Sequence, residues 1–116
     1  MSYIFDGANG QDWQGANWVF RGLSETLLSV LRETPSAEAV AERLEEAMNM
    51  EIGYMDISDL LESPRVSAAW VTAVDRSICK LREKGNAHWH EPEAFEGFLE
   101  KVAELKSLAL VQQQPA

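Results

Sequence analysis

The fold class follows from residues 63–84, SPRVSAAWVTAVDRSICKLREK. A serine followed by a proline is typical of a helix start, because proline has the φ angle of the first turn and needs no N–H there. Apolar residues then recur at three- and four-residue steps, which places them on one helix face. They are Val66, Trp70, Ala73, Val74, Ile78 and Leu81. Basic residues near the end suit the negative end of the helix dipole, so the stretch predicts one long amphipathic helix.

The same apolar spacing predicts two helices upstream of this one. Phenylalanine and leucine recur at helical steps over 17–33, and Pro35 ends that helix because the residue before a proline disfavours the α region. A second apolar series, from Ala37 to Met48, predicts the next helix, with Gly53 as a natural terminator.

Two further helices are expected, one short and one at the C-terminal end. A polar start followed by two leucines indicates a short helix over 56–61. An apolar stripe from Phe95 to Ala109 predicts a last helix that begins near Pro92. Residues 112–116 are polar, and we expect them to fray.

The first sixteen residues follow a different pattern. Asp6-Gly7 and Asn9-Gly10 are turn dipeptides. We therefore expect 1–16 to be an irregular N-terminal segment, in which residues 3–5 can add a short extended piece packed on the domain. The prediction is an all-α fold, a single compact domain over 1–116 of four to five helices with bundle-like or orthogonal packing.

The chain is strongly acidic. Nineteen acidic residues against ten basic ones give a net charge of −9. Such a surface repels nucleic acid and anionic lipid and attracts basic partners over long range, although acidity also keeps a small protein in solution. With one cysteine and no stretch near the ~18 apolar residues of a membrane span, we expect a cytoplasmic protein that binds neither membranes nor nucleic acid directly.

The acidity is concentrated in one stretch. Residues 36–62 carry eight acidic side chains against Arg43 alone, a net charge of −7, whereas residues 65–84 carry a net +3. Two interpretations remain open. The acidic helix packs beside the basic one and the charges pair internally, or the acidic face covers a basic surface of another protein. The candidate partner-binding carboxylates are Glu38, Glu42, Glu45, Glu46, Asp56 and Asp59.

Tryptophan is the other residue type that indicates an interface. Trp70 lies on an apolar stripe and is expected in the core. Trp13, Trp18 and Trp89 fall at element edges or in loops, where tryptophan either covers the core or anchors a partner.

Catalytic signals are weak. The sequence contains no phosphate loop, dinucleotide fingerprint, nucleophile elbow or zinc-protease helix. His88 and His90, followed by acidic residues, resemble half of a metal site, and Cys79 lies near basic residues that could activate a thiol. Loop histidines and a buried or half-buried thiol are the simpler interpretation, so we expect no metal and no cofactor. A small metal- or thiol-dependent enzyme built on these three residues is the alternative.

In size, acidity and helicity the chain resembles two classes of small microbial inhibitor. These are the phage anti-CRISPR proteins and the immunity proteins that neutralise secreted toxins. The resemblance implies a non-enzymatic protein that occludes a basic surface of a target, such as a CRISPR effector or nuclease, or else one cognate bacterial toxin. The acidic residues would provide steering and the tryptophans an aromatic anchor. The oligomeric state stays open.

Overall fold

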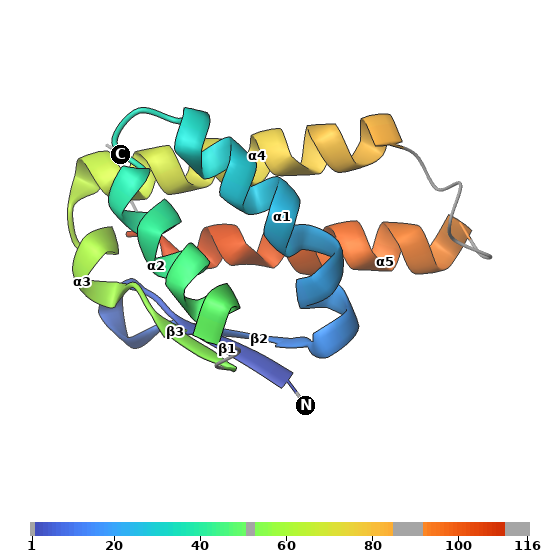
Figure 1. The fold of residues 1–116 in the computed structure, drawn as a ribbon, viewed down its shortest axis with the longest axis horizontal. Helices are drawn as coiled ribbons and strands as arrows, with labels where there is room; N and C mark the ends of the chain where they lie inside the picture. The colour runs from blue at the N-terminus through green and yellow to red at the C-terminus, as the bar shows by residue number, and fades with distance from the viewer. Residues whose placement is uncertain (1, 51–52, 85–91, 111–116) are drawn as a thin grey trace, which may run out of the picture.

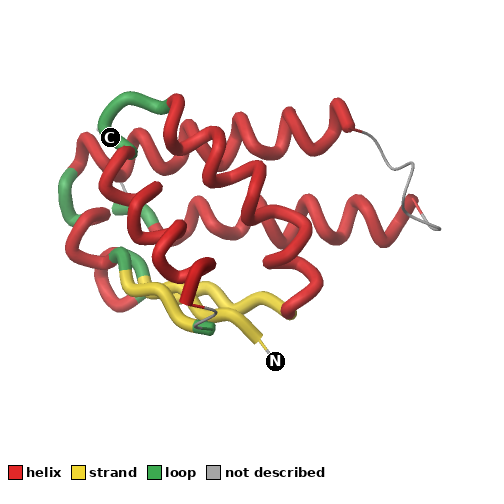
Figure 2. Tube along the Cα trace, in the orientation of Figure 1, coloured by secondary structure: helices red, strands yellow, loops and turns green. Residues whose placement is uncertain are grey.

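The computed structural model describes residues 2–50, 53–84 and 92–110. Helices dominate this part of the chain, and a small sheet lies along one edge of them (Figures 1 and 2). In chain order the elements are β1 (Ser2–Asp6), η1 (Ala8–Gly10), β2 (Asp12–Ala16), α1 (Asn17–Glu33), α2 (Glu38–Met50), β3 (Tyr54–Asp56), α3 (Ser58–Leu61), α4 (Pro64–Lys84), α5 (Pro92–Ala103) and η2 (Glu104–Leu108). None of the described helices combines the length and the apolar composition needed to cross a bilayer.

The predicted helices are present. The helix expected over 17–33 is α1, and α4 begins at the proline of its predicted start. The last helix differs from the prediction, because α5 ends at Ala103 and the chain continues as the short 3-10 helix η2. The short helix α3 begins at Ser58 and not at residue 56, since Asp56 belongs to a strand.

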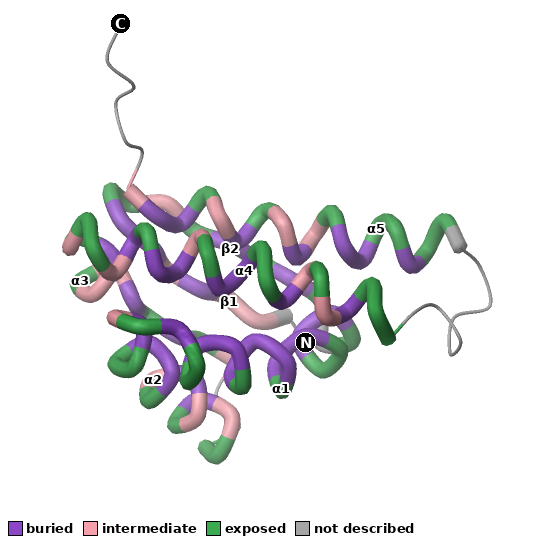
Figure 3. The backbone as a smooth tube through the Cα atoms, turned by 90° about the horizontal axis from the view of Figure 1, so that it is seen from above, coloured by how far each residue is buried: buried purple, intermediate pink, exposed green. Residues whose placement is uncertain are grey.

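Helix α1 organises the packing. It contacts α2, α4 and α5, and α2 and α4 lie on different sides of it (Figure 1). The buried residues of α1, α4 and α5 belong to one hydrophobic cluster, and buried and exposed positions alternate along α4 and α5 (Figure 3). The largest fully buried side chains are Trp70, Phe5, Leu23, Leu27, Leu31, Leu44, Ile57, Leu61, Leu105, Leu108, Val30 and Val40. One core therefore joins the helices to the strands.

The N-terminal segment is not irregular, and the prediction of an all-α fold is wrong in this respect. Strands β1 and β2 form an antiparallel pair, and β3 adds to β1 in parallel, which gives a three-stranded sheet of order β2-β1-β3. The turn residues expected here lie between the first two strands, where Asn9 and Gly10 adopt positive φ. Here the turn residues connect two paired strands. The side chains of these strands alternate between the core and solvent, which is the pattern of a sheet.

Candidate protein-binding surface

The acidic stretch lies on the outer side of α2 and on β3 and α3. Val40 and Leu44 of α2 are fully buried. Glu38, Glu42 and Glu46 are exposed on the opposite side of the same helix. This arrangement follows from the 3.6-residue period of an amphipathic helix, as the sequence predicted.

The basic helix α4 does not neutralise this surface. Arg76 and Lys80 of α4 both approach Glu33 of α1, with N–O distances of 3.6 and 3.4 Å. Among the described residues, no carboxylate of residues 36–62 pairs with a cation of α4, because α1 separates the two helices. These ion pairs therefore do not support internal pairing of the two oppositely charged stretches.

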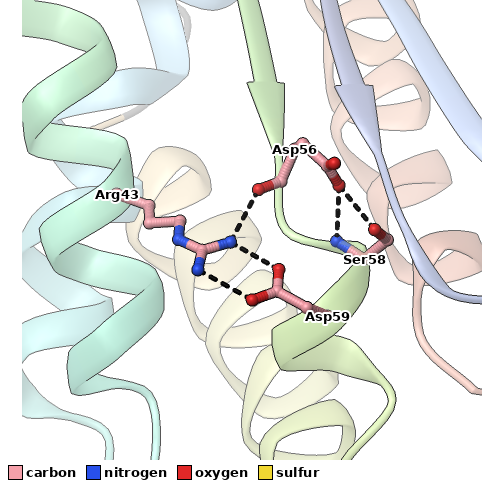
Figure 4. A network of polar contacts seen from close by, with 4 residues as sticks. All are labelled: Arg43, Asp56, Ser58 and Asp59. Carbon is pink, nitrogen blue, oxygen red and sulfur yellow. Dashed lines mark hydrogen bonds and ion pairs between the residues drawn. The ribbon is translucent and has the colours of Figure 1, made fainter.

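Two of the six candidate carboxylates have partners closer by. Glu45 pairs with Arg32 of α1. Asp59 accepts two hydrogen bonds from Arg43, at 2.5 Å to Nη1 and 2.8 Å to Nη2 (Figure 4). The bidentate contact lowers the pKa of Asp59 and raises the pKa of Arg43. Arg43 also donates to the main-chain oxygen of Asp56 at 2.9 Å, which ties α2 to the end of β3.

Asp56 has a local structural role. Its Oδ1 accepts hydrogen bonds from the Ser58 main-chain N–H at 2.9 Å and from the Ser58 hydroxyl at 2.6 Å (Figure 4). These two bonds lower the pKa of Asp56. They hold the turn from β3 into α3 and keep the carboxylate ionised.

Glu38 and Glu42 have no such partner. Neither forms an ion pair or a side-chain hydrogen bond with any residue that the structure describes. A pocket of about 210 Å³ lies beside them, and it is lined by Arg32, Glu38, Ala41, Glu42 and Glu45. The solvent side of α2 thus presents a row of carboxylates that is not neutralised within the described chain.

Exposed apolar side chains lie next to this row. Met50 and Tyr54 are 59% and 47% exposed, which is high for residues of their size. Both line a second pocket of about 160 Å³ between the end of α2 and β3, which Arg43, Glu46, Ala47, Met55 and Asp56 also line. Sequence analysis missed these two residues, although a methionine and a tyrosine inside the acidic stretch were a visible signal.

The three candidate tryptophans have different outcomes. Trp13 is only 3% exposed, and its indole N–H donates to the main-chain oxygen of Lys101 at 3.0 Å. It covers the core, which is the first of the two roles that the sequence left open for it, and a role as a partner anchor stays a prediction. Trp18 is 54% exposed, with its ring centroid 6.2 Å from that of Phe98. Trp89 lies outside the described residues.

Of the three residues on which the alternative enzyme would depend, Cys79 alone lies among the described residues. His88 and His90 also lie outside the described residues. Cys79 is exposed on α4, which corrects the expectation of a buried or half-buried thiol. The described residues contain no group of three or more histidine, cysteine or acidic side chains arranged to hold a metal ion.

Comparison of the chain with protein-family models, curated proteins and solved structures found no match.

Proposed function

We propose that this chain is a non-enzymatic, acidic binding protein that inhibits its target by covering a basic surface. The observation that carries the proposal is the pair Glu38 and Glu42, exposed one helical turn apart and unpaired within the described chain. Like charges at this spacing cost a helix a few tenths of a kcal/mol. A basic partner offsets that cost and is attracted to the row from a distance.

The surface is held ready for binding. Helix α2 is fixed to the core by Val40 and Leu44 and to the α3 end by the Arg43–Asp59 contact. Positions i and i+4 are spaced about 6 Å along the helix axis, so the backbone that carries the carboxylates does not need to be ordered when the partner binds. Exposed apolar side chains at the end of α2 add contact area beside the charges.

The target that suits this surface is a protein whose basic face binds nucleic acid. A regular row of anions on a rigid helix replaces backbone phosphates, so occupation of the face would block the substrate. A CRISPR effector or nuclease is one such target, and a cognate toxin in an immunity pair is the alternative. Inhibition of either target would use the same contact, and the identity of the captured protein distinguishes the two cases.

Affinity capture with matched variants tests the proposal. The wild type, the double variant E38K/E42K and the control E83K/E100K are each immobilised and exposed to lysate of the native host. All four residues are exposed, and the two double variants have the same net charge. We expect a basic protein on the wild type and on the control, absent from E38K/E42K and eluted by rising salt.

The captured protein then provides the functional readout. Its nucleic-acid-dependent or toxic activity is measured during titration with the wild type and with E38K/E42K. We expect stoichiometric inhibition by the wild type and loss of inhibition by the variant. Retention of the same proteins by all three chains, or binding without inhibition, would contradict the proposal.

A further inference from the structure

The outer face of the three-stranded sheet has a pattern that the sequence analysis did not detect. Phe5, Trp13 and Met55 are in register on the inner face and are buried. Because side chains alternate along a strand, their neighbours in register point to the opposite face. Asp12, Asp6 and Asp56 form one row across all three strands, and Gln14, Ile4 and Tyr54 form the next.

The row of three aspartates brings three negative charges to one level of the sheet, and of these the Asp56 charge is stabilised by Ser58 and Arg43. Adjacent strands lie about 4.8 Å apart, and like charges directly opposite one another destabilise a sheet. The three strands contain no lysine or arginine. Asp12 forms no ion pair or side-chain hydrogen bond with any described residue. Asp6 accepts a hydrogen bond from the Tyr54 hydroxyl, which leaves its charge in place.

The second row supplies contact surface of another kind. Ile4 is partly exposed, and Tyr54 is exposed beside the pocket at the end of α2. The face therefore combines a line of negative charge with the adjacent apolar and aromatic atoms of Ile4 and Tyr54. An arginine or lysine side chain matches both, since its stem packs on apolar atoms while its cation meets a carboxylate or an aromatic ring.

We propose that this sheet face docks a lysine- or arginine-bearing segment of a protein partner. The proposal rests on the proposed function, because it extends the basic partner from α2 across the sheet. The occupant follows from charge complementarity: the face carries three carboxylates and no cation of its own strands, and Arg43 of α2, at the Asp56 end of the row, is bound to Asp59. The segment places successive cations along the aspartate row and its apolar stems over Ile4 and Tyr54.

Nuclear magnetic resonance with a defined probe tests this docking. The probe is a short peptide of alternating arginine and alanine, titrated into ¹⁵N-labelled protein, and the control peptide has glutamine in place of arginine. We expect amide shifts concentrated at residues 4–6, 12–14 and 54–56 with the arginine peptide and none with the glutamine peptide. Rising salt weakens the effect, because the contacts are exposed.

A matched pair of variants isolates the charge on the sheet. D12N removes an exposed carboxylate without a partner, and E83Q removes one from the far helix α4. We expect D12N to weaken peptide binding by about 1.4- to fivefold, the range measured for one exposed charge pair, and E83Q to leave it unchanged. Both variants are expected to fold, since neither side chain is buried.

Three outcomes would overturn the inference. Shifts confined to α2, with D12N equal to the wild type, reject the sheet face and leave the proposed function standing. Saturable shifts at the three aspartates with calcium chloride, and none with the peptide, assign the row to a cation. Equal shifts with both peptides show that charge does not direct binding. The capture experiment with E38K/E42K tests the proposed function separately.

Discussion

Replacement of Trp13 by phenylalanine separates a core role from an interface role. The substitution keeps an aromatic ring inside the sheet but removes the indole N–H that donates to the Lys101 main-chain oxygen at 3.0 Å. This hydrogen bond is partly buried, and an acceptor left unsatisfied away from water costs about 1–3 kcal/mol. The smaller ring also loses packing against Phe5, whose centroid lies 5.2 Å away, at about 1 kcal/mol.

We therefore expect W13F to lower the free energy of unfolding by about 2–4 kcal/mol. For a chain of this length each kcal/mol corresponds to about 4 °C in Tm, so the Tm falls by about 8–16 °C. Urea and thermal unfolding followed by circular dichroism measure both quantities. Partner binding below the Tm is expected to stay as in the wild type, because the indole does not reach the surface.

The matched control is W18F. It makes the same chemical change at a ring that is 54% exposed, so the expected loss is below about 1 kcal/mol. A core role for Trp13 is contradicted if the free energy of unfolding of W13F lies within about 0.5 kcal/mol of the wild-type value or is no lower than that of W18F. Loss of binding with unchanged stability would return this tryptophan to the interface.

Three more predictions concern the sheet and the Arg43 contact. G15A is expected to destabilise the fold by about 1–3 kcal/mol in urea unfolding, because a Cβ there would overlap the indole ring packed against this glycine. The Asp6 carboxylate accepts a hydrogen bond from the Tyr54 hydroxyl, which raises the pKa of Tyr54 to about 12. D6N should therefore move the phenolate absorbance titration back toward 10.0, and an unmoved titration would contradict the contact. Arg43 lowers the pKa of Asp59. The stabilisation that the ionised Asp59 contributes is therefore full above the ordinary pKa of 3.8 and is lost as the pH falls through the lower pKa of the folded state. The free energies of unfolding of D59N and of the wild type, measured from pH 7 downward, should converge there.

The helices could be predicted because their signal is local. Apolar residues at helical steps and prolines at the boundaries define α1 and α4 within single stretches of chain. Each of these helices is therefore specified by its own stretch of sequence, and tertiary packing agrees with that local preference. The same reasoning extended the last helix too far, since nothing local marks the change at Ala103 from α-helix to η2.

The sheet could not be predicted in this way. Strands β1 and β2 have five residues each, near the short end of the range in which a period-two pattern can be recognised, and β3 has only three. Strand β3 pairs with β1 in parallel, Tyr54 opposite Ile4, and that pairing depends on α1 and α2 folding back in between. The aspartate row is a consequence of this register and exists only after the three strands align.

The helical periodicity, the strong acidity and its concentration in residues 36–62 can all be read from the amino-acid sequence. Which of those charges are neutralised depends on the fold. Because α1 lies between α2 and α4, the basic helix pairs with Glu33 and leaves Glu38 and Glu42 facing solvent. Coulomb attraction acts through space over a few ångströms, so a sequence states how many charges a surface has, while the fold decides which of them meet.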